Sequence, residues 1–240
     1  MQRVINFSGG KSSAYMTLLE YQVGDIVLFC DTGREHPLTY KFINDFERNE
    51  NIPITKINFP GMFDGLLLKY KYKKIPNRVK RFCTVELKVN TAKRYLKSIG
   101  IIRFENFIGF RFDEPKRVLD RKERFKKVVT RFPLYEKGIT KQMVNDFWSK
   151  KPYTLEIPAI LGNCTLCFMK GKNAILNILS SYPELAEPWI NDEKQSANQY
   201  GHTYFHGVTI EQLRNMAQNN LFKGSDLKEV QPAFSCACTS

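Results

Sequence analysis

The sequence predicts an α/β fold, in which a doubly wound, mainly parallel sheet is followed by a helical, cysteine-bearing C-terminal cap. Short apolar runs alternate with amphipathic stretches over about the first 135 residues, and a glycine- and serine-rich turn joins the first run to a helical pattern. With 240 residues, 42% of them hydrophobic, the chain can build one α/β domain with a sizeable core and a smaller appendage. We therefore expect an α/β domain over residues 1–135 and a helical cap over residues 136–240.

The order of the elements follows from the hydrophobic pattern. Short apolar runs predict four strands, at residues 4–7, 25–30, 54–59 and 104–110. Apolar residues at helical spacing predict helices after Gly10 and over residues 38–50 and 85–99, the second with Pro37 near its first turn. In the cap, the same spacing predicts helices over residues 140–150, 172–181 and 209–219.

The turn after the first strand has the composition of a phosphate-binding loop. Glycines let the backbone approach a phosphate, a helix N-terminus offers unpaired N–H donors, and serine and lysine side chains complete an anion cradle. A Walker A loop would need a glycine five residues before Gly10, where the chain has Ile5. The loop consists of Ser8, Gly9, Gly10, Lys11, Ser12 and Ser13.

The net charge of +13 is concentrated in two stretches. Residues 69–81 contain seven Lys/Arg and no Asp/Glu, and residues 111–131 contain nine Lys/Arg against four Asp/Glu. Such a local field attracts polyanions, which predicts a nucleic-acid partner, with Tyr70 and Tyr72 as candidate base-stacking or packing side chains. A solvated, solubilising face is the alternative.

Paired cysteine spacings indicate a metal site. Two thiolates two or three positions apart can face one metal centre, and zinc and an iron–sulfur cluster both accept four of them. His202 and His206 are possible substitutes, and Cys30, at the end of an apolar strand, is expected to be a small buried hydrophobe. The paired cysteines are Cys164 with Cys167 and Cys236 with Cys238.

The start of the chain lacks the long apolar region and the cleavage site of a secretory signal, and no apolar stretch approaches the ~18 residues of a membrane span. We therefore expect a soluble, cytoplasmic protein without a membrane partner.

The phosphate loop resembles that of the PP-loop ATP pyrophosphatase superfamily, whose usual signature is Ser-Gly-Gly-x-Asp-Ser, with Ser12 where aspartate is commonest. Further elements resemble the phosphoadenylylsulfate (PAPS) reductase branch of that superfamily. They are Asp31-Thr32-Gly33-Arg34-Glu35, Arg81-Phe82-Cys83-Thr84, Gly109-Phe110-Arg111-Phe112-Asp113-Glu114 with Arg117, and Pro133-Leu134 before a helix. Ser8, Asp31 and Arg111 each follow a predicted strand, so they should converge on one crevice.

The resemblance implies an adenine nucleotide alpha hydrolase-like fold that binds ATP with Mg²⁺. It implies that Ser8 to Ser13, Asp31, Thr32, Gly109 and Arg111 hold the nucleotide, and that Lys11, Asp31, Arg111, Asp113 and Arg117 are catalytic. In the part of the family that activates nucleic acids for sulfur insertion, it implies a four-iron cluster beside the nucleotide. Its ligands would be Cys83, Cys164, Cys167 and either Cys236 or Cys238.

Three functions remain open. The preferred hypothesis is an enzyme that adenylates a nucleic acid with release of pyrophosphate, with a sulfur-donor protein as a possible partner. The second is a sulfonucleotide reductase, in which Cys236 or Cys238 near the C-terminus attacks the bound nucleotide. The third is a nucleotide- or nucleic-acid-binding module without catalytic activity.

Overall fold

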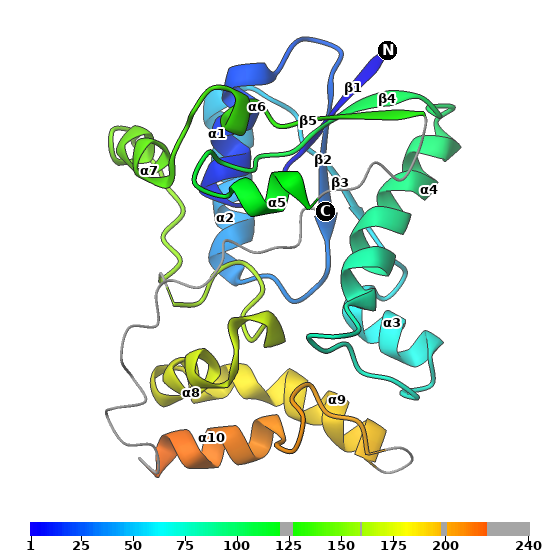
Figure 1. The fold of residues 1–240 in the computed structure, drawn as a ribbon, viewed down its shortest axis with the longest axis vertical. Helices are drawn as coiled ribbons and strands as arrows, with labels where there is room; N and C mark the ends of the chain where they lie inside the picture. Colours follow the sequence, from blue (N-terminus) through cyan, green and yellow to red (C-terminus); the bar gives the residue numbers. More distant parts are fainter. Residues whose placement is uncertain (121–126, 159, 198–200, 220–240) are drawn as a thin grey trace.

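The computed structural model describes residues 1–120, 127–158, 160–197 and 201–219. Within these residues, five strands form one parallel sheet in the order β3-β2-β1-β4-β5 (Figure 1). Val4 of the central strand lies beside Ile26 on one side and Asn106 on the other. The predicted α/β fold with a parallel sheet is confirmed. The strands are β1 (Gln2–Asn6), β2 (Ile26–Asp31), β3 (Thr55–Asn58), β4 (Phe104–Phe107) and β5 (Val128–Arg131).

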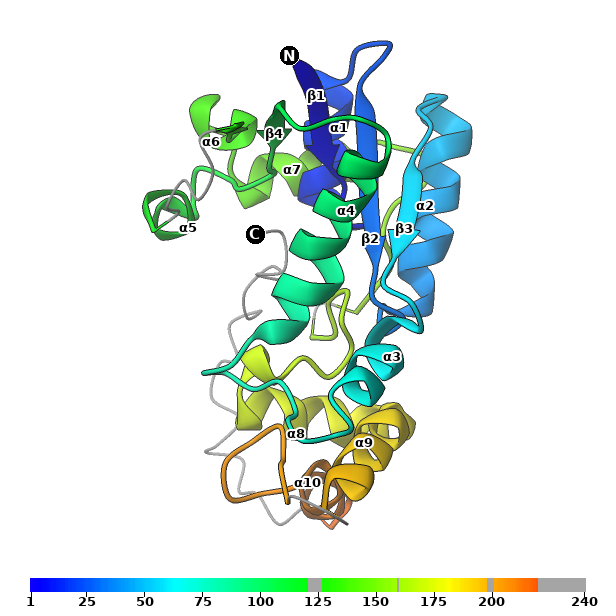
Figure 2. The same cartoon turned by 90° about the vertical axis from the view of Figure 1, so that its right-hand side faces the viewer.

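Helices cover both faces of the sheet, as a doubly wound fold requires. Figures 1 and 2 show α1 and α2 on one side of the strands and α4 on the other. Successive strand residues point to opposite faces. Ile5 and Phe29 accordingly pack with α1 and α2, whereas Val4 and Leu28 pack with Leu96 of α4. These helices are α1 (Lys11–Glu20), α2 (Pro37–Glu50) and α4 (Thr91–Ser98).

The strand order reverses at β1, and this decides where a ligand can bind. The chain moves outward from β1 through β2 to β3, and β4 and β5 then lie on the other side of β1. Open parallel sheets bind ligands beyond the carboxyl ends of their strands, at the point of reversal. The loops that follow β1 and β4 meet at this point, and the loop that follows β2 is their neighbour.

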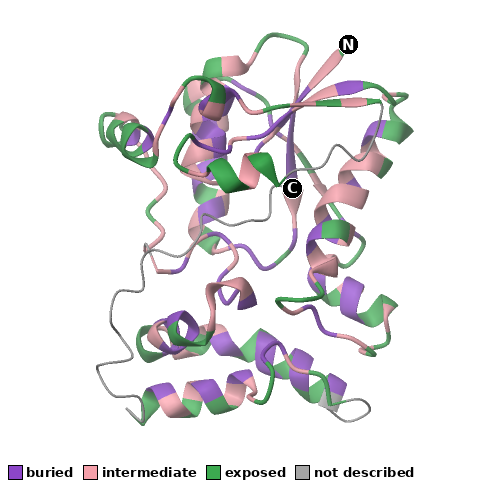
Figure 3. Ribbon diagram, in the orientation of Figure 1, coloured by how far each residue is buried: buried purple, intermediate pink, exposed green. Residues whose placement is uncertain are grey.

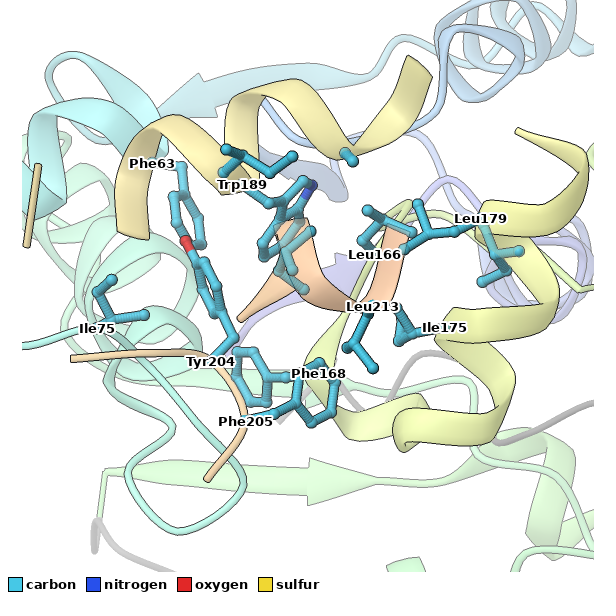
Figure 4. Packing of buried hydrophobic residues seen from close by; sticks show 14 of the residues in the cluster. Phe63, Ile75, Leu166, Phe168, Ile175, Leu179, Trp189, Tyr204, Phe205 and Leu213 are labelled. Carbon is cyan, nitrogen blue, oxygen red and sulfur yellow. The ribbon is translucent and has the colours of Figure 1, made fainter. Parts of the chain in front are cut away.

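A second hydrophobic core lies in the helical part of the chain, at the bottom of Figure 1. At its centre, the Tyr204 ring lies 4.8 Å from the Trp189 ring and 6.2 Å from the Phe168 ring (Figure 4). Figure 3 shows buried residues on the helices that enclose this core. The predicted helical cap is therefore present. The helices are α3 (Met62–Lys69), α8 (Lys172–Ser181), α9 (Glu187–Ala197) and α10 (Ile210–Gln218), with the 3-10 turns η2 (Phe168–Lys170) and η3 (Pro183–Ala186).

The two cores draw on interleaved parts of the sequence. Phe59, Phe63 and Leu87 belong to the core of the helical part, although they precede it in the chain. Val144 and Trp148, from α7 (Lys141–Ser149), belong to the core beside the sheet. A domain boundary after residue 135 stays a prediction.

Several elements were not predicted from the hydrophobic pattern. The four residues of β5 include no buried side chain and fall within the second basic stretch, which hides their strand character. The helix expected over residues 85–99 begins as wider π-helical turns, η1 (Thr84–Asn90), before α4. The helices α3, α9 and the short α5 (Pro115–Leu119) were also not predicted. A helix was predicted to follow Pro133-Leu134, and these two residues instead begin the short α6 (Pro133–Glu136).

Buried Arg34 joins the loop after β2 to the helical part. Its guanidinium pairs with Asp192 of α9 at 3.0 Å and with Asp64 of α3. The same group lies over the rings of Phe63 and Trp189, 5.0 and 5.5 Å from their centroids. Because removal of one partner of a buried ion pair is costly, this contact holds the helical part against the carboxyl end of the sheet.

The carboxylates of α9 should make stability depend on pH. Burial raises the pKa of Asp192 to about 6, although the positive charge of Arg34 lowers it. Burial also raises the pKa of Glu193 to about 7, although two backbone N–H groups that donate to this carboxylate lower it. Both values exceed those of an unfolded chain, so the folded state binds protons more tightly between about pH 4 and pH 7. The free energy of unfolding should therefore rise as the pH falls through this range.

Urea unfolding at pH 5.5 and pH 7.5 measures this dependence. Glu193→Gln cannot titrate, so its unfolding free energy should change less between the two pH values than that of the wild type, whatever its absolute stability. Glu156→Gln removes an exposed carboxylate and is the control. An equal pH dependence in wild type and Glu193→Gln would contradict the assignment.

Among the described residues, no helix combines the length and the apolar character needed to cross a membrane.

Candidate functional site

The turn between β1 and α1 forms a backbone cradle. Gly9 has a φ of 75°, in the left-handed region, and a Cβ atom on it would lie 2.5 Å from Cγ2 of Thr39. Gly10 is the N-cap of α1 in an extended conformation and makes no side-chain capping hydrogen bond. Because glycine has no side chain, no N-cap side chain occupies the first N–H groups of α1, which leaves a helix N-terminus suited to an anion.

Ser13 closes this turn from inside. Its buried hydroxyl oxygen accepts from the Ser8 N–H at 3.0 Å, lies 2.9 Å from Oγ of Ser8, and donates to the Gly10 carbonyl at 2.9 Å. The sequence predicts that Ser13 binds phosphate. In this structure its hydroxyl is engaged in shaping the loop.

Lys11 begins α1 at the mouth of the turn. Partial burial lowers the pKa of its ammonium group, and a neighbouring phosphate would oppose that shift. The indole N–H of Trp148 donates to the Lys11 carbonyl at 2.9 Å, so α7 fixes the first turn of α1 from the side of the core.

The loop after β4 contacts the phosphate loop directly. A Cβ atom on Gly109 would lie 3.2 Å from Cα of Ser13, so only a small residue allows this approach. Arg111 is buried, and its Nη1 donates to the Ser12 hydroxyl at 3.0 Å while its Nε donates to Oδ1 of Asp113 at 3.0 Å. The structure thus brings Arg111 and Asp113 to the phosphate loop.

Arg117 is linked to this group through an intermediate carboxylate. Glu114 pairs with Arg111 at 3.3 Å and with Arg117 at 2.5 Å. The Arg117 guanidinium also lies over the Phe110 ring, 4.0 Å from its centroid. Arg117 is therefore one ion pair further from the phosphate loop than Arg111.

Asp31 ends β2, next to the strand that leads into the phosphate loop. Its Oδ1 accepts from the Gly33 N–H and from the Tyr40 hydroxyl, both at 2.8 Å. Burial, together with the Asp31 carboxylate, raises the pKa of Tyr40, which remains a hydrogen-bond donor. The adjacent Thr32 is buried and donates to Oε1 of Glu35 at 3.0 Å. Tyr40 of α2 therefore holds the Asp31 carboxylate at the carboxyl end of β2.

Asn163 contacts the phosphate loop and is not among the residues predicted from the sequence. Its side-chain N–H donates to the Ser8 carbonyl at 2.7 Å, and its backbone carbonyl accepts from the His36 backbone N–H at 2.6 Å. The next residue, Cys164, forms an isolated antiparallel bridge with Glu35. The only available signal was the position of Asn163 directly before a cysteine that was itself a candidate ligand.

Three of the five candidate cysteine ligands lie in the described part of the chain. Cys83, which precedes η1, and Cys164 both pack against the helical core, and Cys167 is buried. Cys236 and Cys238 lie outside the described residues. In the described part of the chain, including His202 and His206, no group of three or more His, Cys, Asp or Glu side chains could hold a metal ion. These residues by themselves do not fit a four-ligand iron–sulfur or zinc site, which stays a prediction.

Cys30, expected to be a small buried hydrophobe, is partly buried. It lies at the end of β2 with its Sγ 3.7 Å from the Lys88 carbonyl. Burial raises its pKa to about 11, so the thiol is protonated and unreactive at neutral pH.

The two basic stretches differ in structure. In residues 69–81, the charged side chains of Lys71, Lys73, Arg78 and Lys80 are exposed, whereas Tyr70 and Tyr72 pack against the helical core. In residues 111–131, Arg111 and Arg117 are engaged with carboxylates, and residues 121–126 lie outside the described part. The first stretch is therefore the better candidate for binding a polyanion.

Comparison with known proteins bears on the same region. Residues 2–152 match the family model of the phosphoadenosine phosphosulfate reductase domain. The chain is 31% identical over 205 residues to the uncharacterized nin region protein ORF290 of Escherichia phage lambda, which covers 73% of this chain and 68% of that protein.

More distant similarities extend to archaea and to a solved structure. Two uncharacterized proteins of Methanocaldococcus jannaschii are 26% identical over 211 and 200 residues, which is 82% and 78% of this chain. The chain spans 42% and 46% of those two proteins, less than half of each. The crystal structure of phosphoadenylyl-sulfate (PAPS) reductase from Candida auris, in a phosphate complex, matches with a TM-score of 0.47 and 14% identity over 64% of this chain and 76% of that one.

Proposed function

The chain belongs to the phosphoadenosine phosphosulfate reductase domain family, in the PAPS reductase-like branch of the PP-loop superfamily, and from this premise we propose that it adenylates a nucleic-acid substrate with ATP. Family membership supports a nucleotide-related enzyme. The reaction and the acceptor are our proposal. The observation that carries it is the buried Arg111 guanidinium, hydrogen-bonded to Ser12 of the phosphate loop and to Asp113.

In the proposed reaction, a nucleophilic oxygen of the substrate attacks the α-phosphorus of ATP. The bond from that phosphorus to the oxygen bridging the α- and β-phosphates breaks, and pyrophosphate leaves with the bonding electrons. The loop from Ser8 to Ser13 binds the phosphates through its backbone N–H groups, and Lys11 stabilises the charge of the departing pyrophosphate. The uncapped start of α1 and the left-handed Gly9 support this role.

The remaining site residues act on the α-phosphate and the attacking group. Arg111, with Arg117 behind it, stabilises the negative charge that develops during attack, because a guanidinium stays protonated and donates two parallel hydrogen bonds. Asp31 or Asp113 binds the metal ion or orients the attacking oxygen. Mg²⁺, when bound with ATP, would neutralise part of the phosphate charge. Thr32 and Gly109 shape the nucleotide pocket.

The acceptor is proposed to be a nucleic acid bound along residues 69–81. Exposed Lys73, Arg78 and Lys80 can each neutralise a backbone phosphate and release a counterion. A sulfur-donor protein is a further proposed partner, since the loop that carries Cys164 and Cys167 contacts the residues around Glu35 at the crevice.

A sulfonucleotide reductase is the second candidate, and the matched family domain favours it. In that reaction a cysteine thiolate attacks the sulfur of a bound sulfonucleotide, and the nucleotide phosphate leaves. The thiols proposed for this step, Cys236 and Cys238, lie outside the described residues.

Incubation of the protein with α-labelled ATP, with and without nucleic acid, tests the proposal. We expect pyrophosphate release that nucleic acid stimulates. The triple variant Lys73→Gln, Arg78→Gln, Lys80→Gln should bind nucleic acid with a slope of log affinity against log salt that is shallower by about 0.7 to 0.9 for each phosphate that is no longer neutralised. The matched control neutralises the exposed side chains of Lys97, Arg103 and Lys150.

Other outcomes separate the alternatives. Sulfite release from PAPS with a thiol donor, in place of pyrophosphate release from ATP, would establish the reductase. Nucleotide binding without either product would indicate a binding module. An equal change of salt slope in both triple variants would mean that residues 69–81 act only through net charge.

A further inference from the structure

We infer that Asn163 is a positioning residue for the phosphate loop, and that through it the cysteine loop, defined as residues 163–167, sets the affinity of the crevice for phosphate. The second part rests on the proposed function, because it assumes that the crevice binds a nucleotide. The first part depends only on the structure.

Asn163 reaches the phosphate loop from a distant part of the chain. It is buried, with 8% of its surface exposed, and its Nδ2 donates to the Ser8 carbonyl at 2.7 Å. Nδ2 also lies 3.5 Å from the position that a Cβ atom on Gly10 would occupy, so the side chain packs along the outside of the turn. One amide group thus binds Ser8 and lies beside Gly10, two of the residues that form the cradle.

The hydrogen bond to Ser8 determines the direction of a donor in the cradle. A trans peptide is planar, so its C=O and its N–H point in opposite directions. Because Asn163 holds the Ser8 carbonyl on its own side, the N–H of Gly9 must point away from Asn163. Gly9 has the left-handed conformation. Because glycine has wide conformational freedom, the peptide between Ser8 and Gly9 can rotate easily, and the hydrogen bond from Asn163 restricts this rotation.

The cysteine loop is in turn fixed to the end of β2. The His36 N–H donates to the Asn163 carbonyl at 2.6 Å, Glu35 and Cys164 form an antiparallel bridge, and the Thr165 N–H donates to the Arg34 carbonyl at 3.4 Å. Lys170 further donates to the carbonyls of Cys164 and Thr165 at 3.1 and 2.6 Å. A displacement of the backbone of the cysteine loop will therefore move Asn163 relative to Ser8, whereas a side-chain change that leaves this backbone in place will not.

Linkage makes this coupling reciprocal. If two conformations of the cysteine loop differ in their affinity for phosphate, a bound phosphate must shift the equilibrium between these conformations by the same free energy. Asn163 is expected to position the phosphate loop and not to take part in catalysis, since its hydrogen bonds are with the backbone of Ser8 and His36.

Hydrogen exchange of the backbone amides in residues 8–13, measured without nucleotide, tests the first part. We expect Asn163→Ala to increase exchange in this segment several-fold, with little change in the β-sheet. Thr165→Ala is the matched control, because Thr165 is equally buried at 8% and its pairing with Arg34 uses only the backbone. Protection of residues 8–13 in Thr165→Ala should equal that of the wild type.

Asn163→Asp adds a pH signature that a purely structural role would not give. An ionised aspartate cannot donate to the Ser8 carbonyl, whereas a protonated one can. The protection of residues 8–13 in Asn163→Asp should therefore recover towards the wild-type value as the pH is lowered, and Asn163→Ala should show no recovery. Unchanged protection of residues 8–13 in both variants, or an equal loss over the whole protein, would overturn the inference.

Affinity for ATP tests the second part. Asn163→Ala should weaken ATP binding roughly 5- to 30-fold, the usual effect of removing one hydrogen bond in a buried site. If the phosphate loop loosens but the wild type binds no ATP, the proposed function fails and the positioning role stands. If the wild type binds ATP and Asn163→Ala binds it equally well, the coupling to phosphate affinity is wrong.

Discussion

Gly9→Ala is expected to abolish nucleotide binding and to lower the free energy of unfolding by about 2–4 kcal/mol. Two effects add. The left-handed conformation, with φ at 75°, costs a residue with a side chain about 1–2 kcal/mol. The new Cβ atom would also lie 2.5 Å from Cγ2 of buried Thr39, so α2 or the loop must shift. Urea unfolding and ATP titration measure the two losses.

Two controls separate strain from collision. Gly24 has a φ of 98° and no atom within 4 Å of its Cβ position, so Gly24→Ala should show the strain alone and should leave ATP binding intact. Thr39→Ser removes Cγ2, so the double variant Gly9→Ala, Thr39→Ser should regain the part of the stability that the collision takes. Equal losses in Gly9→Ala and Gly24→Ala would show that close approach of α2 is not what requires glycine.

Arg111→Gln is expected to reduce pyrophosphate release by about 10²- to 10³-fold, the usual effect of removing one donor that stabilises a developing charge. Its Nη1 contacts Ser12 and its Nε contacts Asp113, so the planar guanidinium bridges the phosphate loop and the loop after β4. Arg111→Lys keeps the charge but lacks this fork, and it should recover only part of the rate. Single-turnover measurements with α-labelled ATP would give both rates.

Stability must be followed in the same variants. Arg111 pairs with exposed Asp113 and with Glu114, and Glu114 keeps its pair with Arg117 when Arg111 is replaced, so the loss of stability should be modest. Arg103→Gln, at an exposed position, controls for net charge. A folded Arg111→Lys with wild-type pyrophosphate release would remove the guanidinium from the proposed mechanism, and a slow but stable Arg111→Lys would support it.

Much of the sheet and of the phosphate loop follows from local sequence. Each predicted strand is short, apolar and followed by polar residues, and burial on both faces of a parallel sheet requires such runs. The turn from Ser8 to Ser13 is equally local, because a glycine at a left-handed position and the start of a helix are adjacent in the chain. Ser8, Asp31 and Arg111 could be assigned to one edge because parallel strands all end on the same side.

Partners distant in sequence could not be predicted in this way. β5 lacks buried residues and is a strand because it pairs with β4. In the sequence, Asp192 looks like an ordinary carboxylate on a helix surface. It is buried with Arg34 only because α9 lies beside the loop after β2. The same holds for Ser13, whose hydroxyl turns inward to fix the loop.

The parallel α/β fold and the glycine-rich phosphate loop at the first helix are readable from the amino-acid order, since both depend on residues a few positions apart. Three-dimensional packing was needed to show that Asn163 holds Ser8, that Arg111 bridges Ser12 and Asp113, and that the residues around Phe63 belong to the helical core. These contacts join segments separated by up to 155 residues. Hydrophobic periodicity specifies which face of an element is buried, but the partner that covers it is chosen by packing of the whole chain.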